Sequence, residues 1–258
     1  MRLSIVIPVL NEGRALPALL AGLKASFPRA ELIVVDGGSA DDSLARAREQ
    51  AHRVLRTAPG RARQMNRGAA AARGEWLFFL HADSRPGFGA AQLAAQLPEA
   101  PAWGFFRLRL IGRSRALGTI SRLINCRSAW TRIATGDQGL IIHAQLFRRC
   151  AGFAEIPLME DVEFTRRLRA EGKPLAPDLY VESSARRWDE QGVAATVLRM
   201  WALRAAYALG VSPRRLWAHY YGRRALRRDR AGEARLAGNA DRPTERDHII
   251  SKEHQRRG

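Results

Sequence analysis

The segment Glu75-Trp-Leu-Phe-Phe-Leu-His-Ala-Asp83 contains five large apolar residues in succession and then ends on an imidazole and a carboxylate. A parallel sheet buries both faces of its strands, so the continuous apolar run predicts a strand over residues 75–80 inside such a sheet. The polar end requires a separate explanation, because His81 and Asp83 lie where the strand leaves the core.

Strand and helix patterns alternate through the first half of the chain. We expect further strands at residues 3–10, 31–36 and 52–57, and helices at residues 15–25, 41–51 and 61–73. This alternation predicts an α/β fold with a mostly parallel, Rossmann-like sheet flanked by helices. Ligands of such sheets bind at the carboxyl ends of the strands, where this chain places Asn11, Glu12, Asp36, His81 and Asp83.

The second half of the chain is less regular. Residues 102–111 are expected to form a strand in which Arg107 and Arg109 alternate with apolar residues. Helices are expected at residues 114–133, 144–150 and 161–171, and a short strand at residues 139–143. Two Arg-rich helical patterns occupy residues 192–230, separated by Ser212-Pro213, and the polar residues beyond about 232 are expected to be disordered.

Composition narrows the class of protein. The formal charge is +18, which favours polyanionic partners but also follows from an Arg-rich composition without any function. Cys126 and Cys150 are too few for a disulfide framework, so we expect buried thiols in a reducing compartment. The apolar N-terminus is interpreted as a strand, because Pro8 interrupts it and no cleavage site follows. We therefore expect a cytoplasmic protein, either soluble or peripheral at the inner face of a membrane.

The segment Val34-Val-Asp-Gly-Gly-Ser-Ala-Asp-Asp-Ser43 predicts a strand, a tight turn and a helix start. Ser39 and Asp42 fit a helix capping box, which explains them without a ligand. Asp36 lies at the end of the strand, where its carboxylate is placed to accept hydrogen bonds from a base or a ribose. The segment is neither a dinucleotide fingerprint nor a phosphate-binding loop ending in Lys-Ser/Thr, which argues against dehydrogenases and P-loop ATPases.

His81 and Asp83 have two interpretations when taken alone. A carboxylate at a strand end can hold Mg²⁺ or Mn²⁺ and leave coordination positions for phosphate oxygens, with His81 as a second ligand or a donor. The alternative is a solvated strand end without function.

Five motifs become specific when they are taken together. They are Val6-Ile-Pro-Val-Leu-Asn-Glu12, Val35-Asp-Gly-Gly-Ser39, Gly60-Arg-Ala-Arg-Gln-Met-Asn-Arg-Gly68, Leu80-His-Ala-Asp83 and Met159-Glu-Asp-Val-Glu163. In this order the chain closely resembles the family 2 glycosyltransferases of the GT-A fold, over roughly residues 3–190. In detail it looks most like a bacterial subfamily associated with radical-SAM enzymes and selenodomains, commonly labelled arsenosugar biosynthesis glycosyltransferases.

The resemblance implies a catalytic domain over residues 1–190, with a nucleotide-sugar half at about 1–100 and an acceptor half at about 101–190. It is followed by a basic helical extension at 191–231 and a tail at 232–258. The implied nucleotide-sugar site contains Pro8, Glu12, Asp36, Gly38, Arg61, Arg63, Asn66, His81, Ala82, Asp83 and Arg187. The implied acceptor site contains Gly136, Asp137, Gln138 and Trp188. Asp83 corresponds to the last Asp of the family's Asp-x-Asp motif and would hold Mn²⁺ or Mg²⁺, whereas His81 replaces the first Asp.

The resemblance makes Asp161 the base that deprotonates the acceptor hydroxyl, with Glu160 beside it. Inverting transfer needs a carboxylate on one side of the sugar and charge neutralisation of the leaving diphosphate on the other. The alternative for Glu160 and Asp161 is that two acids stabilise the start of a helix. The predicted function is a metal-dependent, inverting glycosyltransferase that uses a UDP- or GDP-linked sugar and a small-metabolite or lipid-linked acceptor.

Two other functions are alternatives, a sugar-phosphate nucleotidyltransferase and a non-catalytic binding protein. A sugar-phosphate nucleotidyltransferase shares the architecture, but no Gly-rich, Lys-terminated loop follows the first strand. A binding protein of the same fold would bind membranes or nucleic acid instead of catalysing a reaction.

The C-terminal helices leave three interpretations open. Helical spacing puts Val193, Val197, Trp201 and Ala208 on one face, and Arg204 falls on that same face. The helices would pack on the catalytic domain, contact a membrane surface through arginines and aromatic residues, or bind nucleic acid, the least favoured partner.

Overall fold

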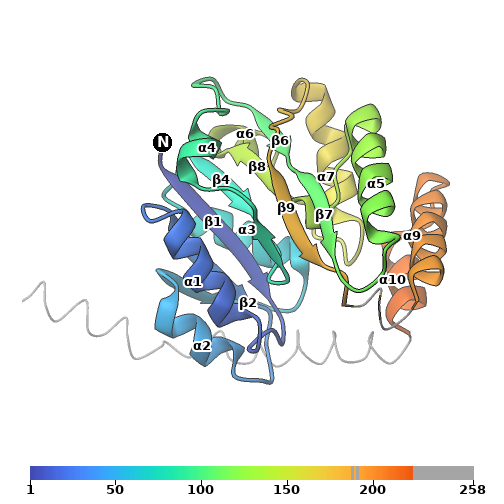
Figure 1. Ribbon diagram of the computed structural model, residues 1–258, viewed down its shortest axis with the longest axis horizontal. Coiled ribbons are helices and arrows are strands. Elements are labelled where there is room, and N and C mark those ends of the chain that lie inside the picture. The colour runs from blue at the N-terminus through green and yellow to red at the C-terminus, as the bar shows by residue number, and fades with distance from the viewer. Residues whose placement is uncertain (187–188, 190–191, 223–258) are drawn as a thin grey trace, which may run out of the picture.

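The computed structural model describes residues 1–186, 189 and 192–222. Within these residues, six strands form the main sheet in the order β3-β2-β1-β4-β8-β6 (Figure 1). Their bounds are Leu3–Val9 for β1, Glu31–Asp36 for β2, Arg53–Arg56 for β3, Trp76–Phe79 for β4, Trp103–Phe105 for β6 and Leu140–His143 for β8. The predicted strands at the start of the chain and at residues 75–80 are confirmed.

The main sheet is parallel from β3 to β4 and antiparallel beyond it. β1 pairs in parallel with β2 and β4, and β2 with β3, whereas β8 runs antiparallel to β4 and to β6. The carboxyl ends of β1, β2 and β4 therefore meet at one edge. Asn11, Asp36 and His81 emerge there, as the strand pattern predicts.

A second sheet of three strands lies beside the first, in the order β5-β9-β7. It contains β5 (Ser84–Pro86), β9 (Tyr180–Ser184) and β7 (Arg107–Ile111). The prediction of one strand over residues 102–111 is therefore wrong, because the chain passes from β6 in the main sheet to β7 in the second. The change occurs at Phe106, whose fully buried side chain packs on Phe78 and Phe88. Ser184 N–H donates to the carbonyl of Asp83, which fixes the second sheet next to the end of β4.

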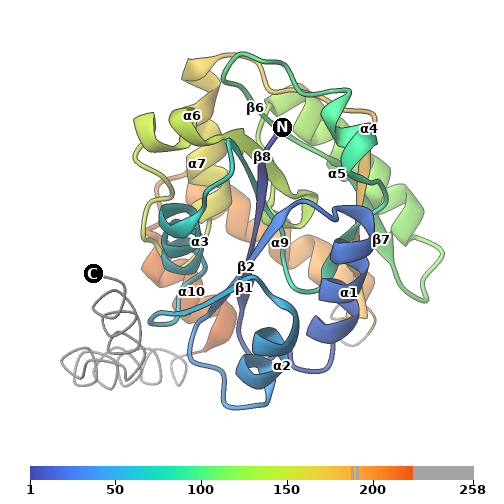
Figure 2. The ribbon, with the colours of Figure 1, turned by 90° about the vertical axis from the view of Figure 1, so that its left-hand side faces the viewer.

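Helices cover both faces of the main sheet. α1 and α3 lie on opposite sides of β1 and β2 (Figure 2). β1 explains both contacts, because Ile5 and Ile7 pack in the core beneath α1, and Val6 packs in the core beneath α3. The described helices are α1 (Leu16–Ser26), α2 (Ser43–Gln50), α3 (Arg61–Ala71), α4 (Ala90–Ala94), α5 (Leu117–Thr131), α6 (Ala144–Arg149), α7 (Glu160–Leu168), α9 (Val193–Ala208) and α10 (Pro213–Tyr221), with 3₁₀ turns η1 (Gly136–Gln138) and η2 (Arg169–Glu171).

The C-terminal helices pack on the start of α7. Leu203 of α9 and Leu216 of α10 are buried against Met159 and Val162. The packing face therefore runs through Leu203, whereas the side chain of Trp201 is 65% exposed. Of the face suggested by helical spacing, Val193 packs against the core as expected, whereas Trp201 does not. The part of the C-terminal tail beyond Gly222, including the expected disorder after 232, lies outside the described residues.

Two further expectations are settled by the structure. Cys126 is exposed and Cys150 is half-buried, so the prediction of two buried thiols is wrong. Cys126 lies on α5, whose buried face instead carries Leu117, Ser121 and Ser128. Across residues 1–186, 189 and 192–222, none of the helices has the length and apolar character needed to cross a membrane.

Candidate active site

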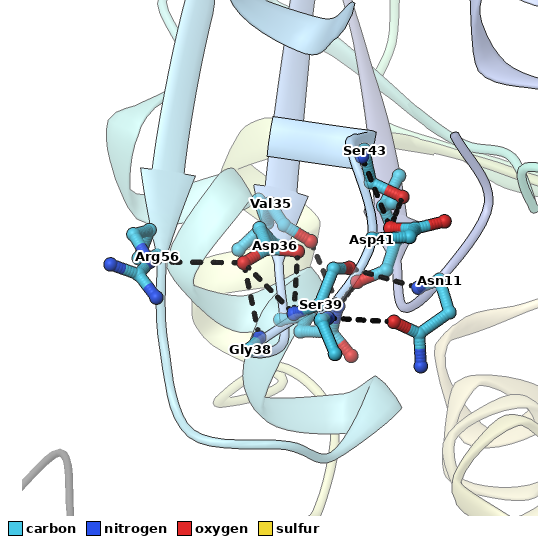
Figure 3. A network of polar contacts seen from close by, with 11 residues as sticks. Asn11, Val35, Asp36, Gly38, Ser39, Asp41, Ser43 and Arg56 are labelled. Carbon is cyan, nitrogen blue, oxygen red and sulfur yellow. Dashed lines mark hydrogen bonds and ion pairs between the residues drawn. The ribbon is translucent and has the colours of Figure 1, made fainter. Parts of the chain in front are cut away.

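The turn after β2 is held by a dense set of hydrogen bonds (Figure 3). The carboxylate of Asp36 accepts hydrogen bonds from the backbone N–H groups of Gly38 and Ser39, at 3.1 to 3.2 Å, and lies 3.8 Å from Arg56 Nε. Asp36 is only 1% exposed. Gly38 adopts a φ of +92°, a conformation that glycine tolerates without strain. Asp36 is therefore a buried residue whose hydrogen bonds fix the conformation of the turn.

The same turn is connected to the end of β1. Asn11 N–H donates to Ser39 Oγ at 2.9 Å, and Asn11 Oδ1 accepts from the N–H of Ala40 at 2.8 Å. The predicted capping box of Ser39 and Asp42 is wrong, because α2 begins at Ser43 and Asp42 makes no capping hydrogen bond. Asp41 accepts from Ser43 N–H instead, and Ser43 Oγ accepts from the N–H of Glu12 at 2.8 Å.

His81 and Asp161 approach each other across Gly136. Gly136 N–H donates to Asp161 Oδ2 at 2.6 Å. A Cβ added to Gly136 would lie 2.5 Å from the His81 imidazole and 3.5 Å from Asp161 Oδ2. Only glycine fits this position without displacing the imidazole, so η1 brings the end of β4 and the start of α7 together.

Asp161 lies at the start of α7 with its carboxylate held by two backbone donors. Its Oδ1 accepts from Val162 N–H at 2.7 Å, and its Oδ2 accepts from Gly136 N–H. Met159, which precedes the helix, has a φ of +68° and so lies in the left-handed region. A carboxylate offers about four lone-pair positions, so these two bonds fix its orientation and leave it able to accept a further hydrogen bond.

Glu160 is buried beside Arg61 of α3. Arg61 Nη1 lies 3.5 Å from Glu160 Oε1, and Glu160 is 2% exposed. Burial raises the pKa of Glu160 to about 7, because desolvation and the neighbouring Asp161 outweigh the attraction of Arg61. Burial opposes the charge on Arg61, but Glu160, Asp161 and Asp83 raise its pKa overall. Arg61 thus links the acids of α7 to Asp83.

A cavity of about 20 Å³ adjoins this pair of acids, and its lining includes His81, Gly136, Glu160, Asp161 and Thr165. It has room for about one water molecule.

Asp137, Arg127 and Arg204 form a second charged group around Asp161. Burial raises the pKa of Asp137, and the carboxylates of Asp161 and Asp83 act in the same direction. Burial and the like charge of Arg204 lower the pKa of Arg127 to about 10, and burial lowers that of Arg204. α5, η1 and α9 therefore form a wall that places two arginines and an acid within electrostatic reach of Asp161.

The other residues assigned from the sequence have different surroundings. Pro8 is buried in β1 opposite Val35, and Ala82 is also buried. Arg63 pairs with Glu155, with Nε 3.2 Å from Oε2. Asn66 uses both ends of its amide on the backbone of Phe153.

Gln138 is 1% exposed, and its amide bonds to Ser128, Thr135 and Phe106. Arg63, Asn66 and Gln138 thus hold loops in place. Arg187 and Trp188 lie outside the described residues.

Asp83 is the residue suited to a divalent cation. It is exposed, and its Oδ1 accepts from Ser84 Oγ at 3.3 Å. The described part of the chain contains no group of three or more His, Cys, Asp or Glu side chains arranged to hold a metal. Mg²⁺ and Mn²⁺ sites often use one or two carboxylates and complete the shell with phosphate oxygens and water. Asp83 fits such a site.

Arg127 is the site residue that the sequence did not reveal. Its segment shows only a helical pattern, so nothing marks this arginine among its neighbours. Arg204 carried a signal, because it fell on an otherwise apolar helix face. Arg61 belongs to the charged cluster, whereas Arg63 does not.

Parts of the chain are similar in sequence to known proteins. Residues 4–97 match the family described as glycosyl transferase family 2. A glycosyltransferase of Mycobacterium tuberculosis strain H37Rv without assigned function is 38% identical over 104 residues, which is 36% of this chain and 39% of that protein. A PGL/p-HBAD biosynthesis glycosyltransferase of Mycobacterium bovis BCG is 41% identical over 90 residues, covering 31% of this chain and 34% of its own. The matched segments thus span less than two fifths of these relatives.

Solved structures show the same fold at low sequence identity. A mannosyltransferase of Pyrobaculum calidifontis in complex with GDP-Man and Mn²⁺ has a TM-score of 0.57 and 19% identity, and the match covers 98% of this chain and 79% of that one. TarS residues 1–349 of Staphylococcus aureus in complex with UDP has a TM-score of 0.55 and 20% identity, over 71% of this chain and 60% of that one. The chain therefore has a GT-A-like fold, and its residues 4–97 match glycosyl transferase family 2.

Proposed function

We propose that this protein transfers a sugar, with inversion, from a UDP- or GDP-linked donor to a hydroxyl group of an acceptor, in a metal-dependent reaction. The observation that carries the proposal is that Gly136 brings His81, at the end of β4, close to Asp161, whose carboxylate is held by two backbone donors, with Arg61 paired to the adjacent Glu160. A divalent cation at Asp83 would neutralise charge on the diphosphate.

The residues of the chain divide the chemistry between two sides of the site. On one side Arg61 provides a positive charge near Asp83, where the leaving diphosphate would gain negative charge. On the other side Asp161 is fixed to accept the proton of the acceptor hydroxyl as the oxygen attacks the sugar. Glu160 would act indirectly, because its ion pair with Arg61 holds the guanidinium group in position. We assign Asp36 and Gly38 to the nucleoside pocket through the turn that they form.

Two neighbours bind the kind of donor proposed here, GDP-Man in the mannosyltransferase and UDP-GlcNAc in TarS. We also propose that the acceptor is a small metabolite, as in the radical-SAM and arsenosugar-associated subfamily that the motifs resemble.

The first experiment is a thermal-shift assay with UDP, GDP, dTDP and CDP, each with and without Mn²⁺. A ligand at about a hundred times its dissociation constant adds about 2.7 kcal/mol to the free energy of unfolding. Stabilisation by UDP or GDP only in the presence of Mn²⁺, absent in Asp83→Ala, is the expected result. No shift with any nucleotide would contradict the proposal.

We further propose that α9 rests against a membrane surface while the protein acts. Its outer face exposes Leu198, Trp201 and Leu209, whose exposed fractions are 67%, 65% and 85%. Sedimentation with vesicles of phosphatidylcholine and phosphatidylglycerol should retain the wild-type protein and release Trp201→Ser. Equal sedimentation of the two proteins would overturn the membrane contact.

A further inference from the structure

The wall formed by α5, η1 and α9 contains hydrogen-bonding atoms that the fold does not use. Arg127 Nε, Arg204 Nη1 and Asp137 Oδ1 are buried and have no hydrogen-bond partner among the described residues. A buried polar atom without a partner costs about 1–3 kcal/mol, and more when it belongs to a charged group. Two donors and one acceptor thus lack hydrogen-bond partners within the described part of the chain, and a bound molecule could supply them.

The two arginines are held next to each other in spite of their like charges. Both are half-buried, and the charge of Arg204 lowers the pKa of Arg127. Arg127 is fixed through its neighbour, because Arg127 Nη2 donates to Ser128 Oγ at 2.9 Å and Ser128 Oγ donates to Gln138 Oε1 at 2.8 Å. The fold therefore maintains a local concentration of positive charge.

The nearby acids do not fully compensate these arginines. Asp161 already accepts two backbone hydrogen bonds, and Asp137 Oδ1 has no described partner. Burial also favours the protonated form of Asp137, which weakens its charge. A positively charged pair with unused donors is complementary to an anion, and guanidinium groups bind phosphate and carboxylate oxygens in a paired geometry.

The wall adjoins the proposed base. Asp137 follows Gly136, whose N–H donates to Asp161 Oδ2, and the charge of Asp161 acts on both Arg127 and Arg204. Asp161 is the proposed base, so a group bound by Arg127 and Arg204 lies on the acceptor side.

We propose that Arg127 and Arg204 form an anion-binding subsite, so that the acceptor carries a phosphate or carboxylate group in addition to the hydroxyl that receives the sugar. Asp137 Oδ1 is placed to accept a hydrogen bond from another hydroxyl of the same molecule. The assignment to the acceptor rests on the proposed transferase function. The anion site itself stands on the unpaired donors.

The test is a calorimetric titration of inorganic phosphate into the wild-type protein and into Arg127→Gln, Arg204→Gln and Arg122→Gln. Arg122 is the matched control, because it lies exposed on α5 and its replacement changes the net charge equally. The protein is first saturated with Mn²⁺ and the nucleoside diphosphate that binds it, so that phosphate cannot enter the donor site. If no nucleotide binds, the titration is made on the free protein.

We expect phosphate to bind the wild-type and Arg122→Gln proteins alike and the other two variants about tenfold more weakly, a difference of about 1.4 kcal/mol. Equal affinity in all four proteins overturns the subsite. A loss of nucleotide affinity in Arg204→Gln as large as the loss of phosphate affinity also overturns it, because both arginines would then serve the donor diphosphate. Failure of every nucleotide to bind contradicts the transferase function alone, since the phosphate titration still tests the subsite.

A second arm identifies the source of the anion. Vesicles of phosphatidylcholine with and without phosphatidic acid are offered to the wild-type and Arg204→Gln proteins. If phosphatidic acid increases binding only for the wild type, the anion belongs to a lipid-linked acceptor. If it affects both proteins equally while the phosphate difference persists, the anion belongs to a soluble acceptor.

Stability provides a readout that a purely structural arginine would not give. In phosphate-free buffer, Arg204→Met should melt at the same temperature as the wild type or higher, because it removes a buried donor that has no hydrogen-bond partner among the described residues. Phosphate should then raise the melting temperature of the wild type and not that of the variant. A lower melting temperature for Arg204→Met, together with an equal phosphate response, would make Arg204 a structural residue. Arg204→Lys serves as a second variant if Arg204→Gln does not fold.

Discussion

The turn after β2 and the wall around Arg127 both contain several charged side chains. In the turn these side chains have hydrogen-bond partners, whereas in the wall some of their atoms have none among the described residues. In the turn, Asp36 receives two backbone donors and faces Arg56, and Asp41 and Ser43 satisfy each other (Figure 3). In the wall, buried atoms of Arg127, Arg204 and Asp137 have no described partner.

This difference suggests a structural role for the turn and a ligand-binding role for the wall. A satisfied network lowers the free energy of the folded chain by itself and fixes the backbone that borders the site. A wall with unused donors costs stability, and such a cost is explained when a ligand supplies the missing partners. The carboxylate of Asp161 lies between these extremes, since it is oriented by two backbone bonds and can still accept a proton.

The largest effect is expected at Asp161. Replacing it by Asn should lower the rate of sugar transfer by at least about a hundredfold, because general base catalysis contributes about 10²–10⁴. Binding of the nucleotide should stay within about twofold of the wild type, as measured by calorimetry. Asp178→Asn is the control, since Asp178 is exposed and pairs only with Arg107 among the described residues. Parallel loss of nucleotide binding would remove the distinction between the base and the donor side.

Asp83→Ala should reduce the affinity for the nucleoside diphosphate in the presence of Mn²⁺ by about tenfold or more, because an exposed carboxylate that anchors the cation would be lost. Calorimetric titrations with Mn²⁺ and with EDTA give the comparison. In EDTA the wild-type and variant proteins should bind alike. A full Mn²⁺ effect in the variant would place the cation elsewhere.

Asp36→Asn should lower the free energy of unfolding by about 1–3 kcal/mol, because two backbone donors would lose a charged acceptor. Urea denaturation measures the change. Asp42→Asn provides the contrast, since its ion pair with Arg46 is exposed and contributes less than about 1 kcal/mol. Similar losses in the two variants would show that the buried turn is no more important for stability than a surface ion pair.

The last prediction concerns the pH dependence of stability that follows from the titration of Glu160. Its pKa is raised from 4.5 to about 7 in the folded protein, so folding favours its protonated form. The resulting stabilisation is complete below pH 4.5 and is lost as the pH rises through about 7. The stability of the wild type relative to Glu160→Gln should therefore fall over this interval, as measured by thermal melts. A difference that does not change with pH would show that Arg61 keeps Glu160 ionised.

Much of the structure around the proposed nucleotide site could be predicted from the sequence. The apolar run of β4 and the strand–turn–helix pattern around Asp36 depend on local periodicity and on turn-forming residues, so they predicted the parallel sheet and the edge at which its polar residues meet. The local detail at Ser39 and Asp42 was mistaken, because hydrogen bonds from Asn11 and Glu12, distant in the chain, replace the capping box.

The structure around the proposed acceptor site could not be predicted in this way, because it depends on tertiary contacts. Residues 102–111 read as one strand, yet the chain changes sheets at Phe106, and periodicity within one segment carries no information about which strand lies beside it. Arg127 and Arg204 are 77 positions apart, and neither belongs to a recognisable motif.

The sequence by itself therefore determined the class of fold, the edge that carries the site and the acids that stand there. Only the packing of α5 and α9 brought Arg127 and Arg204 within electrostatic reach of Asp161 and left some of their buried atoms without partners among the described residues, because burial and the lack of partners are properties of side chains brought together from distant segments.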